Sequence, residues 1–203
     1  MQTVIVNGQS VTPSKVVCIG RNYVAHIEEL GNEIPDQMVV FNKPNSAISN
    51  TLYSSLDEPL HYEGELAFVV KSGKLAAVGF GLDLTKRTLQ SKLKEKGLPW
   101  ERAKAFDGAA LFSEFVPLPS GVDELSLRLT IDNELRQAGG VSLMMYKPQT
   151  ILQELAKFTT LEDGDIIMTG TPKGVGVVNA GECFKGQVLT GKEVLISTSW
   201  IAK

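Results

Sequence analysis

Two carboxylates that could bind a cation, Glu63 and Glu65, stand directly before an apolar run that extends to Val70. Residues two apart in a β-strand lie on one face, about 7 Å from each other, so both side chains would share a face at the start of a buried strand. Like charges at that distance repel each other unless they face open solvent, one takes a proton, or a cation lies between them. The pair alone does not choose among these arrangements, so a third ligand has to be sought.

Asp83 is the candidate for that third ligand, because it ends the next apolar strand, expected over residues 76–82. Its ordinary interpretation is a cap for the helix expected over residues 86–96, and the ordinary interpretation of the two glutamates is a solvated strand end. Together, three oxygen donors without Cys or His suit a hard cation, Mg²⁺ or Mn²⁺ before Ca²⁺, since they leave coordination positions for water and substrate. Because Glu-x-Glu alone is a weak motif, the metal site is a hypothesis based on all three residues.

His26 and Glu29 could form a general base. A short helix is expected after the buried strand 16–19, capped by Asn22 and ended by Gly31, and the two residues lie three apart on its face. A hydrogen bond between them would fix the imidazole tautomer and raise its basicity, which is the minimal arrangement for activating water. The alternative is an exposed histidine with a chance acidic neighbour.

Cationic and backbone N–H groups are expected from four other segments. Lys104 is placed in a tight turn, where it is either solvated or a partner for a substrate carboxylate or oxyanion, and Lys43 is expected to face solvent or reach a ligand. The Gly/Thr loop over residues 169–176 presents N–H groups and hydroxyls that could hold a carboxylate or phosphate. The Lys-rich segment 86–96 is predicted to be a solvated helix face.

The pattern along the 203 residues favours one α+β domain, 1–203, made mostly of strands with a few short helices. Residues 125–131 alternate apolar and polar side chains and predict a hairpin with 134–137, and residues 148–158 predict an amphipathic helix. A Walker A-like segment at 186–192 is rejected, because glutamate replaces the required Ser/Thr and a strand follows it.

Charge and composition exclude several classes of protein. The net charge of -3 argues against a nucleic-acid surface, and no apolar stretch is long enough to cross a membrane. The N-terminus lacks the pattern of a signal peptide, so a cytoplasmic protein is expected. The two cysteines, Cys18 and Cys183, lack the spacing of a zinc site.

In chain order, these residues resemble the fumarylacetoacetate hydrolase family. The resemblance rests on Gly-Arg-Asn-Tyr at 20–23 with His26 and Glu29, on Glu63-x-Glu65, on Asp83 with Thr85 and Arg87, on Lys104 with Phe106, and on Thr-Gly-Thr-Pro-x-Gly-Val-Gly at 169–176. It implies a mixed β-sandwich roll, usually a homodimer. The length is similar to the short, single-domain acylpyruvate hydrolase branch of that family.

The resemblance also implies roles for individual residues. It implies that Mg²⁺ or Mn²⁺, with Ca²⁺ as a substitute in crystals, is bound by Glu63, Glu65 and Asp83. It implies His26 and Glu29 as the water-activating dyad and Lys104 as the partner of an oxyanion or carboxylate. A pocket for a small keto acid would be lined by Arg21, Gln90 and Thr171.

The activity expected from the resemblance is hydrolysis of the carbon–carbon bond of a 3-acylpyruvate such as acetylpyruvate or fumarylpyruvate. The 1-carboxylate and 2-oxo oxygens would chelate the metal, His26 would take a proton from water, and the metal would stabilise the departing pyruvate enolate. Oxaloacetate decarboxylation or tautomerisation, or isomerisation of a hydroxymuconate-type diacid, needs the same enolate without water, and the loop 31–35 is expected to act as a lid that positions water. A non-catalytic metal-binding β domain is the alternative from another class.

Overall fold

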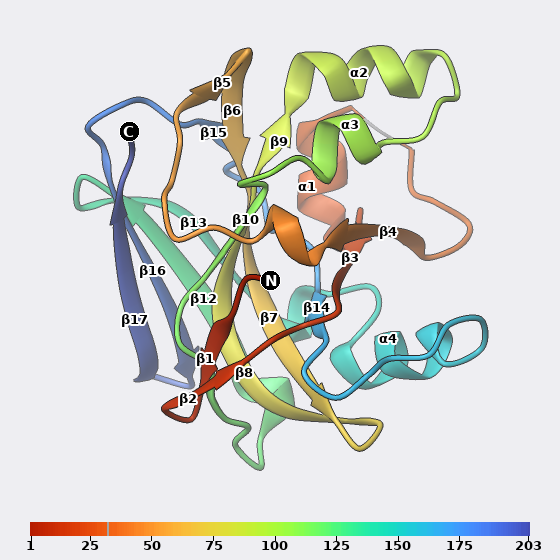
Figure 1. The fold of residues 1–203 in the computed structure, drawn as a ribbon, viewed down its shortest axis with the longest axis vertical. Coiled ribbons are helices and arrows are strands. Elements are labelled where there is room, and N and C mark those ends of the chain that lie inside the picture. The colour runs from red at the N-terminus through yellow and green to blue at the C-terminus, as the bar shows by residue number, and fades with distance from the viewer. Residues whose placement is uncertain (32) are drawn as a thin grey trace.

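A seven-stranded mixed β-sheet and a four-stranded antiparallel β-sheet, accompanied by small sheets and a few short helices, form the fold of this chain (Figure 1). The structure, a computed structural model, describes residues 1–31 and 33–203. Residue 32, inside the loop expected to act as a lid, lies outside the described residues. The mostly β, α+β class predicted from the sequence is confirmed.

The larger sheet is mixed, with the strand order β10-β8-β7-β14-β3-β4 and with β11 beside β8. Strand β14 pairs parallel with β3 and antiparallel with β7, so strands from the start, middle and end of the chain meet at its centre. Because both faces of β7 are covered, its sequence is an unbroken apolar run after Glu65. The strands are β3 Lys15–Gly20, β4 Val39–Pro44, β7 Gly64–Lys71, β8 Lys74–Asp83, β10 Ala110–Phe112, β11 Val116–Pro117 and β14 Ile166–Met168.

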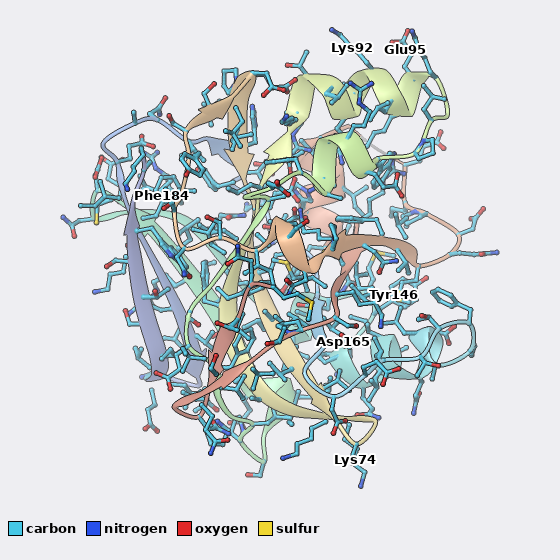
Figure 2. All side chains as sticks on the ribbon, viewed as in Figure 1. Lys74, Lys92, Glu95, Tyr146, Asp165 and Phe184 are labelled. Atoms are coloured by element: carbon cyan, nitrogen blue, oxygen red, sulfur yellow. The ribbon has the colours of Figure 1, made fainter. Side chains whose placement is uncertain are left out.

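The second sheet is antiparallel, with the order β13-β12-β16-β17, and it packs across the larger sheet. Phe184 of β16, labelled in Figure 2, is buried between the sheets and meets Tyr62 edge-on with 5.3 Å between ring centroids. A Cβ at Gly186 would overlap the ring of Phe80, so a glycine is required where β16 crosses β8. The strands are β12 Leu125–Ile131, β13 Glu134–Gly140, β16 Cys183–Thr190 and β17 Glu193–Ile201, which confirms the predicted hairpin.

Short elements complete the fold, with β1 paired to β2 and with β6 paired to β5, β9 and β15 in small sheets of their own. The small strands are β1 Val4–Val6, β2 Gln9–Val11, β5 Ser55–Leu56, β6 Glu58–Tyr62, β9 Thr85–Lys86 and β15 Gly176–Val177. The 3₁₀ turns are η1 Asn45–Ala47, η2 Val122–Glu124 and η3 Val141–Leu143.

Three of the four α-helices in the described residues gather at one end of the larger sheet (Figure 1). These are α1 Val24–Glu29, α2 Arg87–Glu95 and α3 Glu101–Lys104, whereas α4 Pro148–Leu155 lies lower in the view and packs its apolar residues against β3 and β14. Every helix in the described part of the chain is too short and polar to cross a membrane. The end of the sheet beside α1, α2 and α3 is where the acidic residues converge.

Asn22 does not cap α1, contrary to the prediction. The helix begins after Tyr23 without a side-chain cap. Asn22 is fully buried and donates to the carbonyl oxygens of Tyr146 and Thr169, at 2.9 and 2.8 Å, while its own oxygen accepts from Tyr146 N. Buried backbone groups of two other segments need these partners, so Asn22 ties the start of α1 to the Gly/Thr loop.

Candidate metal and active site

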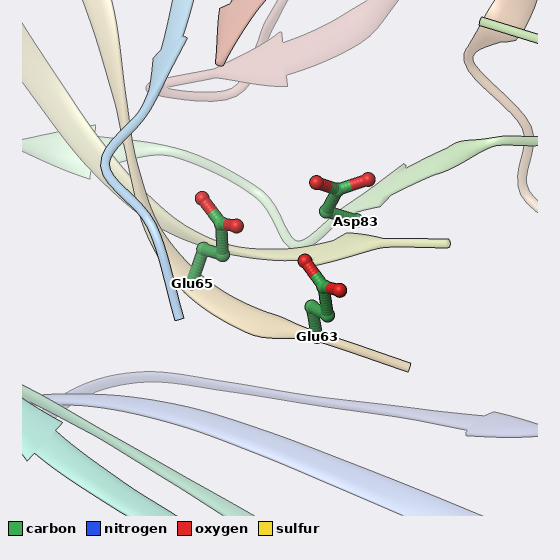
Figure 3. Close-up of side chains that lie close together, drawn as sticks. All are labelled: Glu63, Glu65 and Asp83. Carbon is green, nitrogen blue, oxygen red and sulfur yellow. The ribbon is translucent and has the colours of Figure 1, made fainter. Parts of the chain in front are cut away.

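Three buried carboxylates meet where β7 begins and β8 ends (Figure 3). Antiparallel pairing of these strands, with Asp83 N donating to Glu63 O at 2.8 Å, brings Asp83 beside the glutamate pair. Glu63, Glu65 and Asp83 each offer one oxygen, and these oxygens lie within 4.8 Å of one another. The three residues therefore form a cluster of a size that suits a single metal ion.

Lys104 lies against two members of this carboxylate cluster. Its ammonium donates to Glu63 Oε2 at 2.9 Å, to Asp83 Oδ2 at 2.8 Å and to Thr85 Oγ1 at 2.7 Å. Burial would lower the pKa of Lys104, but Asp83 and Glu63 raise it above its ordinary value. The lysine ends helix α3 and is buried, so the solvated lysine in a tight turn, one of the two alternatives left open by the sequence, is wrong.

Further cations hold the cluster from the other sides. Arg87 forms an ion pair with Glu63, and Lys43, completely buried, lies 2.8 Å from Asp83 Oδ1 and donates to the carbonyl oxygen of Lys104. Burial would raise the pKa of Glu63, but Lys104 and Arg87 hold it well below its usual range. Lys43 is thus a structural partner of the cluster, a role that the sequence left open.

Glu65 differs from its two neighbours. Its carboxylate accepts a hydrogen bond from Gly170 N at 2.7 Å, and no lysine or arginine of the described residues forms a salt bridge with it. Burial, and then the charges of Asp83 and Glu63, raise the pKa of Glu65 well above its ordinary value. A divalent cation would supply the missing positive charge, and three carboxylates without nitrogen or sulfur donors suit Mg²⁺, Mn²⁺ or Ca²⁺.

His26 and Glu29 form the predicted pair on α1. His26 Nδ1 lies 3.2 Å from Glu29 Oε2, and the backbone N–H of Gly174 donates to both oxygens of Glu29 at 2.9 and 3.1 Å. Gly174 has φ of +100°, and a Cβ there would overlap the carbonyl oxygen of Arg136, so only glycine fits. The carboxylate orients the imidazole with Nδ1 as donor, which leaves Nε2 as the proton acceptor.

The Gly/Thr loop therefore binds carboxylates of the protein itself, Glu65 through Gly170 and Glu29 through Gly174. A buried glutamine, Gln137 of β13, fastens this loop to β7. Its side chain accepts from Gly64 N and donates to Thr171 Oγ1 and Pro172 O, each at 2.8 Å. Sequence reasoning missed Gln137, because nothing along β13 distinguishes it from a surface residue.

One pocket collects nearly all the residues singled out from the sequence. Arg21, Gln90 and Thr171 line it together with His26, Lys104 and the carboxylate cluster, while Glu29 lies behind His26. Arg87 Nη1 donates to Gln90 Oε1 at 2.9 Å, which turns the glutamine amide N–H₂ away from Arg87. The lining also includes Lys94 and Trp100, which the sequence analysis did not select.

Known proteins share this sequence and this fold. Residues 15–197 match the sequence model of the fumarylacetoacetate (FAA) hydrolase C-terminal family, and the chain belongs to that family. It is 37% identical over 200 residues to the oxaloacetate tautomerase YcgM of Escherichia coli, covering 87% of this chain and 91% of that protein. It is 39% identical over 186 residues to the mitochondrial oxaloacetate tautomerase FAHD1 of Bos taurus, covering 82% of this chain and 83% of that protein.

A solved structure with a ligand is also similar. The fumarylpyruvate hydrolase of Pseudomonas aeruginosa, in complex with Mn²⁺ and pyruvate, superposes with a TM-score of 0.87 at 28% identity, covering 99% of this chain and 95% of that chain. The family predicted by the resemblance is confirmed, and the proteins similar to this chain include both oxaloacetate tautomerases and a fumarylpyruvate hydrolase.

Proposed function

We propose that the protein catalyses the keto–enol tautomerisation of oxaloacetate with Mg²⁺ or Mn²⁺ held by Glu63, Glu65 and Asp83. The observation that carries the proposal is one pocket that contains both the carboxylate cluster and an imidazole whose Nδ1 faces Glu29. Relatives 36 to 39% identical over more than four fifths of the chain are named oxaloacetate tautomerases. This activity replaces acylpyruvate hydrolysis, the first expectation from the sequence, as the better supported one.

His26 is proposed to move the proton in this reaction. When bound, the divalent ion acts as a Lewis acid that favours negative charge on the oxygen of the 2-oxo group. His26 Nε2 accepts a proton from carbon 3 of the keto form, and Glu29 stabilises the imidazolium through Nδ1. The imidazolium then returns this proton to the 2-oxo oxygen, which gives the enol and restores the neutral imidazole. Because Glu29 is itself fixed by Gly174, the imidazole keeps one orientation through the cycle.

Lys104 is proposed to position the metal ligands. Its three N–H donors are all used by Glu63, Asp83 and Thr85, so it would have to exchange one of these acceptors to reach an oxyanion. Gln90 is proposed to donate its amide N–H₂ to the substrate 1-carboxylate, since its oxygen is bonded to Arg87. Arg21 and Thr171 complete the lining beside it.

Acylpyruvate hydrolysis is the second candidate, favoured by the same pair of residues. A histidine oriented by a carboxylate can equally remove a proton from water, and the similar fumarylpyruvate hydrolase was solved with Mn²⁺ and pyruvate. Both reactions pass through an enolate of a 2-oxo acid. They differ in whether water or carbon 3 lies next to His26 Nε2.

The experiment follows the ultraviolet absorbance of enol oxaloacetate with added Mg²⁺ or Mn²⁺ and with a chelator, and assays acetylpyruvate and fumarylpyruvate in parallel. We expect metal-dependent tautomerisation with a larger kcat/KM than either cleavage reaction. His26→Gln should lower kcat by about 100-fold, as expected for a general base, without changing the metal affinity. An interconversion rate equal to that of metal ions in buffer alone would contradict the proposal.

A further inference from the structure

Lys94 is a cation of the pocket that forms no salt bridge with a carboxylate of the described residues. It lies on α2 four residues after Gln90, so both project from the same face of the helix into the pocket. Its ammonium lies over the ring of Trp100, 5.2 Å from the centroid, and that ring packs against Phe41 with 5.9 Å between centroids. Within the described residues, no acidic side chain forms a salt bridge with Lys94, and an aromatic face alone holds its half-buried ammonium.

The other cations near Lys94 have different partners. Arg87 is bonded to Glu63 and Gln90, and Lys104 is bonded to Glu63 and to Asp83. Burial first, then the charges of Arg21 and Arg87, lower the pKa of Lys94 to about 8, and the attraction of Glu63 is the weaker influence. An anion that binds beside Lys94 would relieve both the burial of an unpaired charge and this repulsion.

The charge balance of the pocket shows what kind of anion fits. Among the described lining residues, Arg21, Arg87, Lys94 and Lys104 are cationic and only the three members of the carboxylate cluster are acidic. A divalent ion in the cluster would add two further positive charges. The filled site would then have an excess of positive charge that a ligand with a single carboxylate neutralises only in part.

We propose that Lys94 binds the distal carboxylate of a dicarboxylic 2-oxo acid, whose 1-carboxylate and 2-oxo group face the carboxylate cluster. The inference rests on the proposed function in one respect, that a keto acid is the ligand of this pocket. It makes Lys94 a specificity-determining residue that favours oxaloacetate, with its second carboxylate, over acetylpyruvate, whose distal end is neutral. Trp100 keeps the ammonium extended toward that carboxylate.

The test compares Lys94→Met with the matched control Lys92→Met. Lys92 lies two residues away on the same helix, but it is exposed on the outer face, where Figure 2 labels it. Calorimetry on the Mg²⁺-loaded proteins measures the Kd of oxaloacetate and of oxalate, a small dianion that has the chelating end and no distal group. Turnover gives kcat and KM for oxaloacetate and acetylpyruvate, and thermal unfolding confirms that both variants fold.

We expect K94M to raise the Kd and KM of oxaloacetate by about ten-fold or more, the effect of losing one hydrogen bond to a charged group. The kcat, the Kd of oxalate and the KM of acetylpyruvate should stay close to the wild-type values, and K92M should change none of them. The inference would be overturned if K94M and the wild type bound oxaloacetate with equal affinity, or if K94M lost as much affinity for oxalate as for oxaloacetate.

The same data separate this inference from the proposed function. If the wild-type protein binds oxaloacetate without interconverting its tautomers, only the proposed function fails and the K94M calorimetry still decides the role of Lys94. If the wild-type protein binds oxalate but not oxaloacetate, both fail.

Discussion

Replacing Glu65 with glutamine should separate metal binding from folding. The carboxylate of Glu65 accepts a hydrogen bond from Gly170 N at 2.7 Å, and the amide oxygen of a glutamine can accept the same bond. The substitution also removes one of three buried negative charges whose oxygens lie within 4.8 Å. The metal-free E65Q protein should therefore unfold with a free energy equal to or greater than that of the wild type.

The size of the expected change in Tm follows from the effect of metal binding on stability. An ion present at one hundred times its Kd stabilises the native state by about 2.7 kcal/mol. For a chain of this length that is a rise in Tm of about 5–10 °C. If E65Q weakens the affinity about 100-fold, the same metal concentration stabilises it by only about 0.4 kcal/mol, a shift of about 1 °C.

Differential scanning calorimetry with and without Mn²⁺ measures both quantities. Glu193→Gln is the matched control, because Glu193 is exposed on β17 and should leave the metal-induced shift unchanged. A full metal-induced shift in E65Q would refute the assignment of Glu65 as a ligand. A metal-free E65Q protein several kcal/mol less stable than wild type would refute the electrostatic argument.

Three other predictions follow from the loop, the glutamine and the lysine. Gly174→Ala should lower both Tm and kcat, because its Cβ overlaps Arg136 O and displaces the N–H that holds Glu29. Gln137→Leu should reduce the free energy of unfolding by about 2–4 kcal/mol, measured by urea denaturation, since it leaves buried hydrogen-bonding groups unpaired. The kcat/KM for oxaloacetate should fall above pH about 8, where the ammonium of Lys94, whose pKa burial lowers to about 8, loses its proton.

Each of these predictions has its own control. Gly181→Ala changes a glycine that also has positive φ, +88°, but has open space around its Cβ, so it reports the backbone strain without the clash. If G174A and the wild type have equal kcat, the Gly/Thr loop does not influence His26. If the urea midpoint of Q137L is unchanged, Gln137 does not stabilise the loop. The fall in kcat/KM above pH about 8 should be absent in K94M. If K94M shows the same fall, a group other than Lys94 causes it, which contradicts the prediction.

The carboxylate cluster was predictable from the sequence because its cause is local. Apolar runs fix β7 and β8 as neighbouring buried strands, and acidic residues at their ends must then meet. The His26–Glu29 pair was predictable for the same reason, since helical spacing alone brings the two side chains together. In both cases the geometry depends on one element or on one strand pair.

The residues that sequence reasoning missed or left open depend on long-range packing. Lys43 reaches Asp83 across 40 positions of the chain and Gln137 reaches Gly64 across 73, so no local pattern distinguishes them from surface residues. Lys94 belongs to a helix whose many lysines are typical of a solvated face, and only the position of Trp100 shows which lysine faces inward. The cap predicted for Asn22 and the solvated turn considered for Lys104 were wrong because burial, which the sequence does not reveal, decides the partners of both side chains.

A crystal structure of the wild-type protein grown with Mn²⁺ and oxalate tests the central claim most directly. Oxalate imitates the chelating end of a pyruvate enolate, and Mn²⁺ can be identified by its anomalous scattering. We predict one Mn²⁺ ion between Glu63, Glu65 and Asp83 with oxalate on its open positions beside His26. An anomalous map without a peak among the three carboxylates, or with oxalate bound elsewhere, would contradict the account.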